Sequence, residues 1–515
     1  MKNHVEVNSQ RLWARLNEIG HIGSDPRGGV SRFAWEPAYK EAVTLLVRWI
    51  EEAGLTARID TVGNVFARLE GSDPEAPAIL SGSHLDTVPQ GGCFDGLSGV
   101  MGALESLIAI RESGLPHRRP LEMVAFINEE ASQFLGGTFG SKAMCGMLPE
   151  DYAFHLRNRQ TGQLLSDAMR EFGMGLDPDR LAQSRIDPKA YCGFLEMHIE
   201  QGRYLLDGNK PFSIVSAVAG IKQFYITFQG TAAHAGGMAM SDRHDALATA
   251  AAVISAVETL AKNCSANTRG TVGYISVLPC EHNIIAEKAT ISVDFREAED
   301  AKWEKLYTDL MEVTRRECEK RQVEWSVEST CDLRPAHCAP EMVRVLEEAA
   351  TGSGYEKERM ISFPAHDAMN MSRIMPMGML FLRSSNGGLS HCPEEYTTQE
   401  DLTLGTQVLA NALYLASNRD FQKYAKGDQV YDSGSFVYSR HCDHHAGKRC
   451  GDYRGRGGCG DRKPDQCRWT DGGDPGGVDG SQSDQCRRKG HYAGAHRCPH
   501  PYGRRPGPGR VPGPQ

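Results

Sequence analysis

The sequence lacks the features that mark several special classes of protein. No stretch of its 515 residues approaches the run of about 18 apolar residues that a membrane-spanning helix requires. Its first residues, Met1–Glu6, lack the apolar run of a secretory signal. With 40% hydrophobic and 24% charged residues, the composition excludes collagen-like, coiled-coil and wholly disordered chains. We therefore expect a cytoplasmic globular protein with more than one domain and no membrane partner.

Cysteines are present, but no pattern for structural metal binding accompanies them. The chain has 15 cysteines, and nine of them are scattered before residue 433 without a C-x-x-C pair. In a cytosolic protein of this size, such cysteines are typically reduced and mostly buried. The other six lie in the last 83 residues, without the spacing of a zinc knuckle.

Residues 433–515 differ in composition from the rest of the chain. They contain 18 Gly, 15 Lys and Arg and 8 Asp, but no Leu, Ile, Met or Glu, so their net charge is +7. The first 432 residues carry −16, which argues against a nucleic-acid partner. We expect a disordered tail, because it cannot bury enough apolar surface to offset the entropy of ordering. An out-of-frame translation past the true stop and a basic nucleic-acid-binding arm are the alternatives.

Strands and helices alternate over most of the chain. Expected strands include 78–80, 121–127, 224–228, 289–296 and 379–382, and expected helices include 97–110, 244–260, 300–320 and 342–350. This order predicts an α/β domain, interrupted by a smaller α+β sandwich. We place the first segment of the larger domain at 1–212, the inserted domain at 213–330 and the second segment of the larger domain at 331–420.

Three polar motifs follow the predicted strands of the first segment. His84 and Asp86 stand at i and i+2, so both point to one side of an extended chain. Asp95 lies between glycines in Gly91–Gly96, and Glu129-Glu130 end the strand that begins at Leu121. Each motif also fits an ordinary polar turn or a solvated carboxylate pair. Together they favour a metal site, with one glutamate free to act as a general base.

Two later histidines, His198 and His391, lie in polar stretches flanked by glycine. A single histidine is more often a structural residue than a ligand. The combined set of histidines and carboxylates, without thiolates, suits a hydrolytic site with two zinc or two manganese ions.

These motifs resemble the dinuclear-zinc aminoacylase/carboxypeptidase superfamily. Gly91–Gly96, His198–Gly202 and His234-Ala235-Gly236 resemble its amidase/hydantoinase/carbamoylase branch, and the resemblance runs from about Arg11 to Ala416. It implies a catalytic domain with a mixed sheet flanked by helices, interrupted by a lid and dimerisation domain, in a homodimer. It also implies two divalent metal ions per subunit, zinc being the first expectation and manganese, cobalt or nickel the alternatives.

The resemblance assigns a role to each candidate residue. It implies His84, Asp95 and His198 as ligands of one metal and Asp95, Glu130 and His391 as ligands of the other, with Asp95 bridging. It implies Glu129 as the general base and Asp86 as the partner of the His84 imidazole. It implies that His234 of a partner subunit polarises the scissile carbonyl, and that Gln201, Asn283 and Arg296 hold the substrate amide and carboxylate.

Two positions depart from the family pattern. Met238-Ala239 replace a common Thr-Pro pair, and Ser362–Ala365 replace a small, glycine-rich stretch before His366-Asp367. The implied substrate is a small ureido or amide acid, and the implied activity is hydrolysis of N-carbamoyl-L-amino acids. Hydrolysis of allantoate or of β-ureidopropionate is the alternative. A non-catalytic metal-binding protein is the alternative of another class, but such a protein would not need Glu129.

Overall fold

In the computed structural model, the described residues are 5–421, and all of them belong to one compact unit. The predicted tail, 433–515, lies outside the described residues. Within the described part of the chain, no helix has both the length and the apolar character that crossing a bilayer demands.

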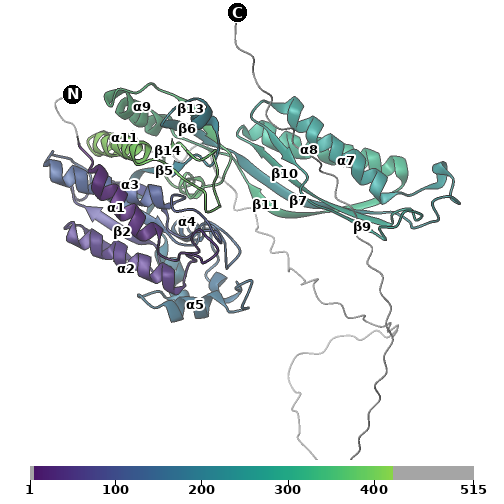
Figure 1. The fold of residues 1–515 in the computed structure, drawn as a ribbon, viewed down its shortest axis with the longest axis horizontal. Helices are drawn as coiled ribbons and strands as arrows, with labels where there is room; N and C mark the ends of the chain where they lie inside the picture. Colours follow the sequence, from purple (N-terminus) through teal and green to yellow (C-terminus); the bar gives the residue numbers. More distant parts are fainter. Residues whose placement is uncertain (1–4, 422–515) are drawn as a thin grey trace, which may run out of the picture. The chain divides into compact units, whose positions relative to one another are not determined.

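A nine-stranded mixed sheet carries most of the core (Figure 1). Its order is β1-β2-β4-β3-β5-β14-β6-β12, with β13 also paired to β6. The central strands β4, β3, β5 and β14 are parallel and almost wholly buried, so helices must cover both of their faces. The strands are β1 (Thr56–Ile59), β2 (Val65–Leu69), β3 (Ala78–His84), β4 (Leu121–Phe126), β5 (Tyr191–Ile199), β6 (Phe212–Val218), β12 (Ala336–His337), β13 (Arg359–Ser362) and β14 (Met377–Leu382).

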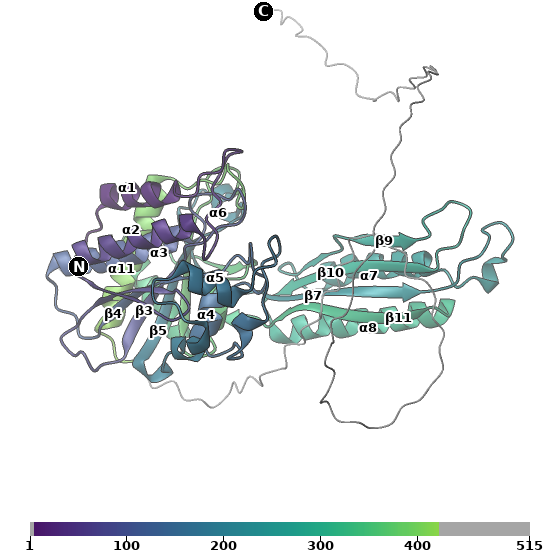
Figure 2. The same ribbon diagram turned by 90° about the horizontal axis from the view of Figure 1, so that it is seen from below.

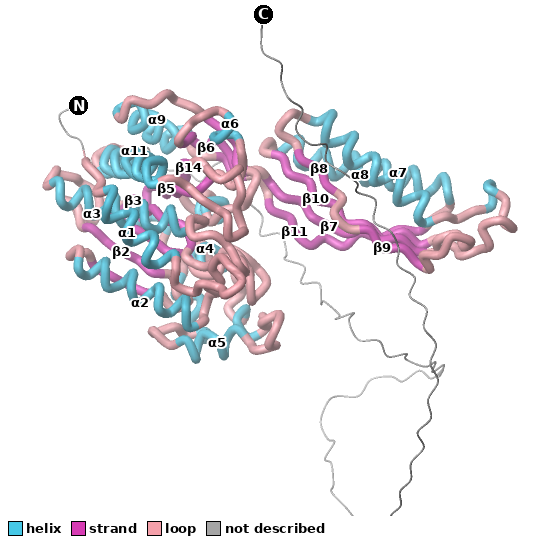
Figure 3. Tube along the Cα trace, viewed as in Figure 1, coloured by secondary structure: helices cyan, strands magenta, loops and turns pink. Residues whose placement is uncertain are grey.

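Helices alternate with these strands along the chain (Figure 3). Met197 of β5 packs against the helices that contain Gly102 and Gly405, whereas its neighbour Glu196 accepts the backbone N–H of Ala368 on the other face. The helices are α1 (Ser9–Gly20), α2 (Pro37–Glu52), α3 (Leu97–Ser113), α4 (Phe139–Met144), α5 (Leu165–Phe172), α6 (Tyr204–Asp207), α9 (Pro340–Gly352), α10 (Ala368–Met371) and α11 (Gln399–Ser417).

A second sheet, of five antiparallel strands, has its own apolar core (Figures 1 and 2). Its order is β11-β7-β10-β8, and β9 also pairs with β10. Along β10, Ala289, Ile291, Val293 and Phe295 are buried and the residues between them are not, because two helices cover only one face. The elements are β7 (Gly220–Gln229), β8 (Arg269–Thr271), β9 (Ile275–Leu278), β10 (Lys288–Glu297), β11 (Glu324–Leu333), α7 (Ala246–Cys264) and α8 (Asp300–Arg321).

The change from one sheet to the other falls later than the sequence predicts. We placed the start of the inserted domain at residue 213, but β6 belongs to the nine-stranded sheet, where it pairs with β14 as far as Val215 and with β12 and β13 as far as Val218. The second sheet begins at Gly220, and β11 ends at Leu333. The apolar run Phe212–Val218 fits either sheet, so only the pairing partner decides its place.

Candidate active site

The candidate residues of the catalytic domain meet at one edge of the nine-stranded sheet. His84 is the last residue of β3, His198 is the last but one of β5, and Glu129 comes three residues after β4. These strands are parallel, so their carboxyl ends lie together, where open α/β sheets commonly bind ligands. The sequence predicted that β3 ends at Leu80. It continues to His84, so the histidine projects from a strand and not from the turn after it.

Asp95 lies at the centre of the cluster, in the loop that precedes α3. Its Oδ1 is 2.9 Å from Nε2 of His198 and 3.4 Å from Nε2 of His84. Its Oδ2 is 3.0 Å from Nε2 of His391, which is itself 3.4 Å from Oε1 of Glu130. One oxygen of this carboxylate therefore faces two histidines and the other faces the third.

Three groups of side chains among the described residues could each hold a cation, because the nitrogen and oxygen atoms of each group lie within 4.8 Å of one another. Two of them contain Asp95: His84, Asp95 and His198, and Asp95, Glu130 and His391. The third is His84, Glu129 and Glu130. The two groups with Asp95 are those that the family resemblance implies. The structure thus brings together five residues that the sequence spreads over more than 300 positions.

Asp86 contacts the glutamate pair instead of the His84 imidazole. Its Oδ1 accepts the backbone N–H of Glu129 and its Oδ2 that of Glu130, each at 3.0 Å. His84 Nδ1 lies 3.0 Å from the backbone oxygen of Asp86 and 3.9 Å from the carboxylate. The expected carboxylate–imidazole hydrogen bond is therefore replaced by one to the backbone.

Burial and mutual charge shift the pKa values of this cluster in opposite directions. Burial raises the pKa of Glu129 well above its ordinary value, and the charges of Asp367 and Asp86 add to the rise. Burial would also raise the pKa of Asp95, but His198, His391 and His84 hold it well below the ordinary range. Carboxyl groups whose environments separate their pKa values in this way are typical of acid–base sites.

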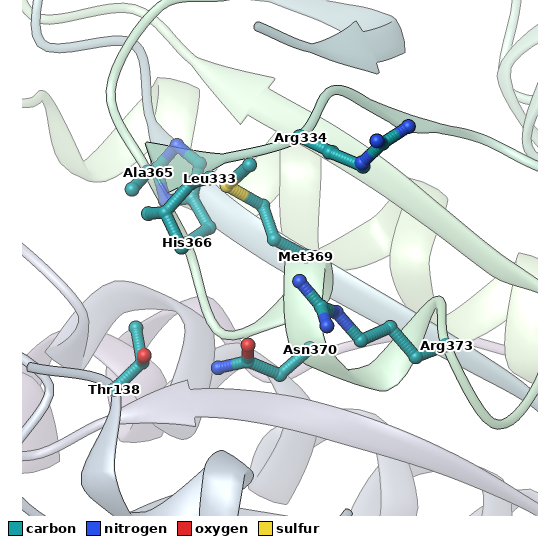
Figure 4. Close-up of a pocket in the computed structure, with 8 residues that line it drawn as sticks. All are labelled: Thr138, Leu333, Arg334, Ala365, His366, Met369, Asn370 and Arg373. Carbon is teal, nitrogen blue, oxygen red and sulfur yellow. The ribbon is translucent and has the colours of Figure 1, made fainter. Parts of the chain in front are cut away.

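A second set of buried polar side chains, which includes His366 and Asp367, lies next to the histidine cluster. The ring centroid of His366 is 4.5 Å from that of His198, and burial keeps the pKa of His366 well below its ordinary value. Asp367 accepts a hydrogen bond from Ser141, and burial beside Glu196 raises its pKa to about 8. His366 also lines a small pocket in which residues 365–373 face the end of β11 and Thr138 (Figure 4).

Two further candidates, His234 and Asn283, lie next to each other in loops beyond the second sheet. The backbone N–H of Ala235 donates to the carbonyl of Asn283 at 2.8 Å. Nδ1 of His234 accepts the backbone N–H groups of Gly236 and Gly237, at 3.1 and 3.0 Å. Because Nδ1 is an acceptor, the ring proton must be on Nε2, and this exposed nitrogen is a hydrogen-bond donor.

Arg296 lies at the other end of the same sheet. Gln229 and Lys288 pair at one end of β10, and Ile221 and Arg296 pair near the other, eight residues away along the strand. At about 3.3 Å per residue, these two pairs lie about 26 Å apart, and the loops of His234 and Asn283 continue from the pair that is far from Arg296. The Arg296 guanidinium forms two hydrogen bonds with Asp294, at 3.1 Å each. One small substrate cannot reach both ends within a single chain.

Gln201 was predicted to bind substrate, and it lies inside the cluster. Its Nε2 is 2.7 Å from Oδ2 of Asp95 and 3.2 Å from Nε2 of His391. Sequence reasoning missed Glu395, which accepts the backbone N–H of Asp95. The signal was an acidic residue four positions after His391, but one glutamate in a loop does not by itself indicate a site.

The chemistry of the donor set fits divalent cations. The five residues offer imidazole nitrogens and carboxylate oxygens, which suit zinc and manganese. Asp86, Asp95, Glu129 and Glu130 lie close together and buried or nearly so, beside the imidazoles of His84, His198 and His391. Such an excess of buried carboxylates is costly without protons or cations to share. Bound cations would relieve this cost.

Comparison with known proteins defines the class of protein. Residues 80–415 match the model of peptidase family M20/M25/M40, and the chain belongs to this family. An N-carbamoyl-L-amino acid amidohydrolase of Geobacillus stearothermophilus is 37% identical over 412 residues, which cover 79% of this chain and 98% of the relative. Allantoate deiminase 1 of Glycine max is 33% identical, covering 76% of this chain and 86% of the relative.

A solved structure agrees with these relatives. It is an amidase of the hydantoinase/carbamoylase family from Burkholderia multivorans, with 31% sequence identity and a TM-score of 0.73. The match covers 81% of this chain and 100% of that one. The predicted family and the mixed α/β fold class are thereby confirmed.

Proposed function

We propose that this protein is a metal-dependent amidohydrolase that cleaves N-carbamoyl-L-amino acids to the amino acid, ammonia and carbon dioxide. The observation that carries the proposal is the position of Glu129, which neither group built around Asp95 needs as a ligand, although Glu129 also forms a candidate group with His84 and Glu130. A protein that only stored or sensed metal would need the ligands but not this carboxylate. The similarity to an N-carbamoyl-L-amino acid amidohydrolase supports the substrate class.

In this proposal, the cluster holds two divalent cations, one in each of the two groups that contain Asp95. Bound there, the cations would supply Lewis acidity toward a water molecule and toward the scissile carbonyl. Zinc is our first assignment, and manganese, cobalt and nickel remain alternatives with the same donor chemistry. Asp95 would contact both cations, because its two oxygens face different histidines.

Glu129 would act on the protons of the reaction. Its raised pKa makes it a stronger proton acceptor than an ordinary carboxylate. It would take the proton of the attacking water and return it to the leaving nitrogen when the C–N bond breaks. Asp86 would keep the glutamate backbone in place through the hydrogen bond to the Glu129 amide.

The proposal assigns the substrate contacts to two subunits. Arg296 would bind the substrate carboxylate with the N–H groups that Asp294 and the carbonyl of Phe363 do not occupy, since a guanidinium has five and these contacts use three. Gln201 would contact the substrate amide from the metal cluster. His234 and Asn283 would come from the partner subunit, because in their own chain their loops leave the end of the sheet opposite to Arg296. The Nε2–H of His234 would then donate to the oxygen of the scissile carbonyl.

A homodimer formed through the inserted domain would bring His234 and Asn283 of one subunit to the site of the other. Strand β9 pairs only with β10 among the described strands, and exposed apolar side chains cluster on and around it. An exposed edge of this kind favours association with another chain. The large apolar side chains that are exposed there are Met240, Leu247, Tyr274, Ile275, Leu278 and Ile284.

One assay tests the proposed activity and its nearest alternative. Ammonia release would be measured with N-carbamoyl-L-amino acids, N-carbamoyl-β-alanine and allantoate, and release of a free amino acid with a dipeptide. Each measurement would be made before and after chelation, with the Glu129→Gln variant as the blank. We expect the highest kcat/KM with an N-carbamoyl-L-amino acid. Preference for allantoate would favour the second candidate, which the allantoate deiminase of Glycine max supports. No turnover of any substrate would contradict the proposal and favour a binding protein.

A further inference from the structure

Glu395 is a buried carboxylate whose hydrogen bonds reach across 300 residues of sequence. Its side chain lies in the loop between β14 and α11 and is only 4% exposed. Its Oε1 accepts the backbone N–H of Phe94 and that of Asp95, each at 2.9 Å. Its Oε2 accepts the hydroxyl of Ser390 at 2.7 Å. These contacts leave neither oxygen without a donor.

The contacts of Glu395 join two loops that each supply one side of the cluster. The first loop contains Asp95, and the second contains His391, four residues before Glu395. Neither residue lies in a helix or strand, so no ladder of backbone hydrogen bonds fixes their separation. The carboxylate of Glu395 and the hydroxyl of Ser390 supply that connection instead. Ser390 Oγ also lies 3.1 Å from Oδ2 of Asp95, the oxygen that faces His391.

The first loop is shaped to receive this side chain. A Cβ atom on Gly92 would lie 2.2 Å from Oε1 of Glu395 and 2.4 Å from its Cβ, so only glycine leaves room for the carboxylate. Glycine at this position therefore has a packing reason that the sequence alone does not reveal. The close approach also shows that Glu395 is held in one position by the loop it binds.

We propose that Glu395 is a positioning residue that sets Asp95 opposite His391 and so builds the second metal group, Asp95, Glu130 and His391. This inference rests on the metal assignment of the proposed function. A carboxylate that accepts two backbone N–H groups holds the peptide before and after Phe94 in one orientation. The Asp95 side chain then leaves the backbone in the direction of His391. Partners of this kind commonly change metal affinity 10- to 100-fold when they are removed.

The test measures metal binding by the full-length protein after chelation. The variants are Glu395→Ala, Glu395→Gln and, as the matched control, Glu394→Ala at the exposed neighbouring position. Zn²⁺ alone is titrated by calorimetry, and Co²⁺ alone is followed by its visible absorption, which reports the ligand geometry. We expect Glu395→Ala to weaken the binding of one ion per subunit by about 10- to 100-fold and to change the Co²⁺ spectrum. Glu395→Gln keeps an acceptor oxygen for both amides, so its affinity should stay close to that of Glu394→Ala.

The outcomes separate this inference from the proposed function. Two tightly bound ions in Glu395→Ala, with an unchanged Co²⁺ spectrum, would overturn the positioning role and leave the proposed function intact. Failure of the unaltered protein to bind any divalent ion would overturn both. If Glu395→Ala does not fold, Ser390→Ala and Gly92→Ala replace it, because the first removes the link to Oε2 and the second displaces the carboxylate. Normal binding of both ions by these two variants would likewise overturn the role.

Discussion

Asp86 accepts the backbone N–H of Glu129 at 3.0 Å, and its second oxygen accepts the next amide along the chain. One buried carboxylate thus fixes the backbone of two adjacent glutamates, and the side chains of these glutamates have different neighbours in the cluster. Glu129 lies beside His84, whereas Glu130 also approaches His391. A single turn after β4 can therefore supply both a base and a ligand.

This division of roles predicts different losses for two neighbouring substitutions. Glu129→Gln should retain both ions and lower kcat by about 10²- to 10⁴-fold, because it removes only the proton acceptor. Glu130→Gln should lose one ion per subunit. Elemental analysis after gel filtration and steady-state kinetics measure the two effects, and the exposed Glu150→Gln serves as the control. Near-normal turnover of Glu129→Gln at full metal content would reverse the assignment within the pair.

The separation of His234 from Arg296 predicts complementation between inactive subunits. His234→Ala should lower kcat far more than it raises KM, because its contact strengthens when negative charge develops on the carbonyl oxygen. Mixing His234→Ala with Glu129→Gln should restore part of the activity, since one mixed site contains both intact residues. The two chains would carry different tags, so that heterodimers can be isolated and assayed. Isolated heterodimers without activity would rule out a shared site.

Arg296 should act on substrate binding more than on turnover. Its guanidinium is oriented by Asp294 before any substrate is present, so its contribution is made already in the ground state. Arg296→Ala is expected to raise KM with a smaller change in kcat, and Arg296→Lys should recover little, because an ammonium cannot replace the bidentate fork. Full kinetics with a carbamoyl amino acid and with its amide would check this. An equal loss for both substrates would show that Arg296 does not bind the carboxylate.

The raised pKa of Asp367 predicts that the free energy of unfolding of the chelated protein depends on pH. Its pKa is about 8 in the folded protein, against an ordinary value of 3.8. Between these values the folded state holds a proton that the unfolded state has released. The free energy of unfolding therefore falls as pH rises through this window, by at most about 1.4 kcal/mol per pH unit for one proton.

The Asp367→Asn variant should lack the contribution of Asp367 to the pH dependence of the free energy of unfolding, because an amide does not titrate. Urea unfolding of the chelated protein at several pH values from 5 to 8 would compare the two chains. Asp73→Asn, at an exposed position, is the control and should follow the unaltered protein. Parallel pH profiles for Asp367→Asn and the unaltered protein would show that Asp367 is not protonated in the folded state.

The sequence by itself determined the main elements of the fold. The alternation of Ala289, Ile291, Val293 and Phe295 with polar residues predicted β10, and the apolar run after Leu121 predicted β4. Periodicity is a local property, so it can be recognised without the tertiary structure. The motifs around His84, Asp95 and the glutamate pair were also visible, because each combines ligand chemistry with a strand end or a glycine turn.

Only the tertiary structure decided which of these residues meet and what holds them. The parallel pairing of β3 with β4 and β5 places His84, Glu129 and His198 at one edge, and pairing with β14 assigns β6 to the larger sheet. The hydrogen bonds of Asp86 to the glutamate amides and of Glu395 to the Asp95 amide have no sequence signature. They join main-chain atoms of any residue type to a carboxylate, and in the case of Glu395 the partners are 300 positions apart. Such contacts depend on where loops end in space, which local residue patterns do not encode.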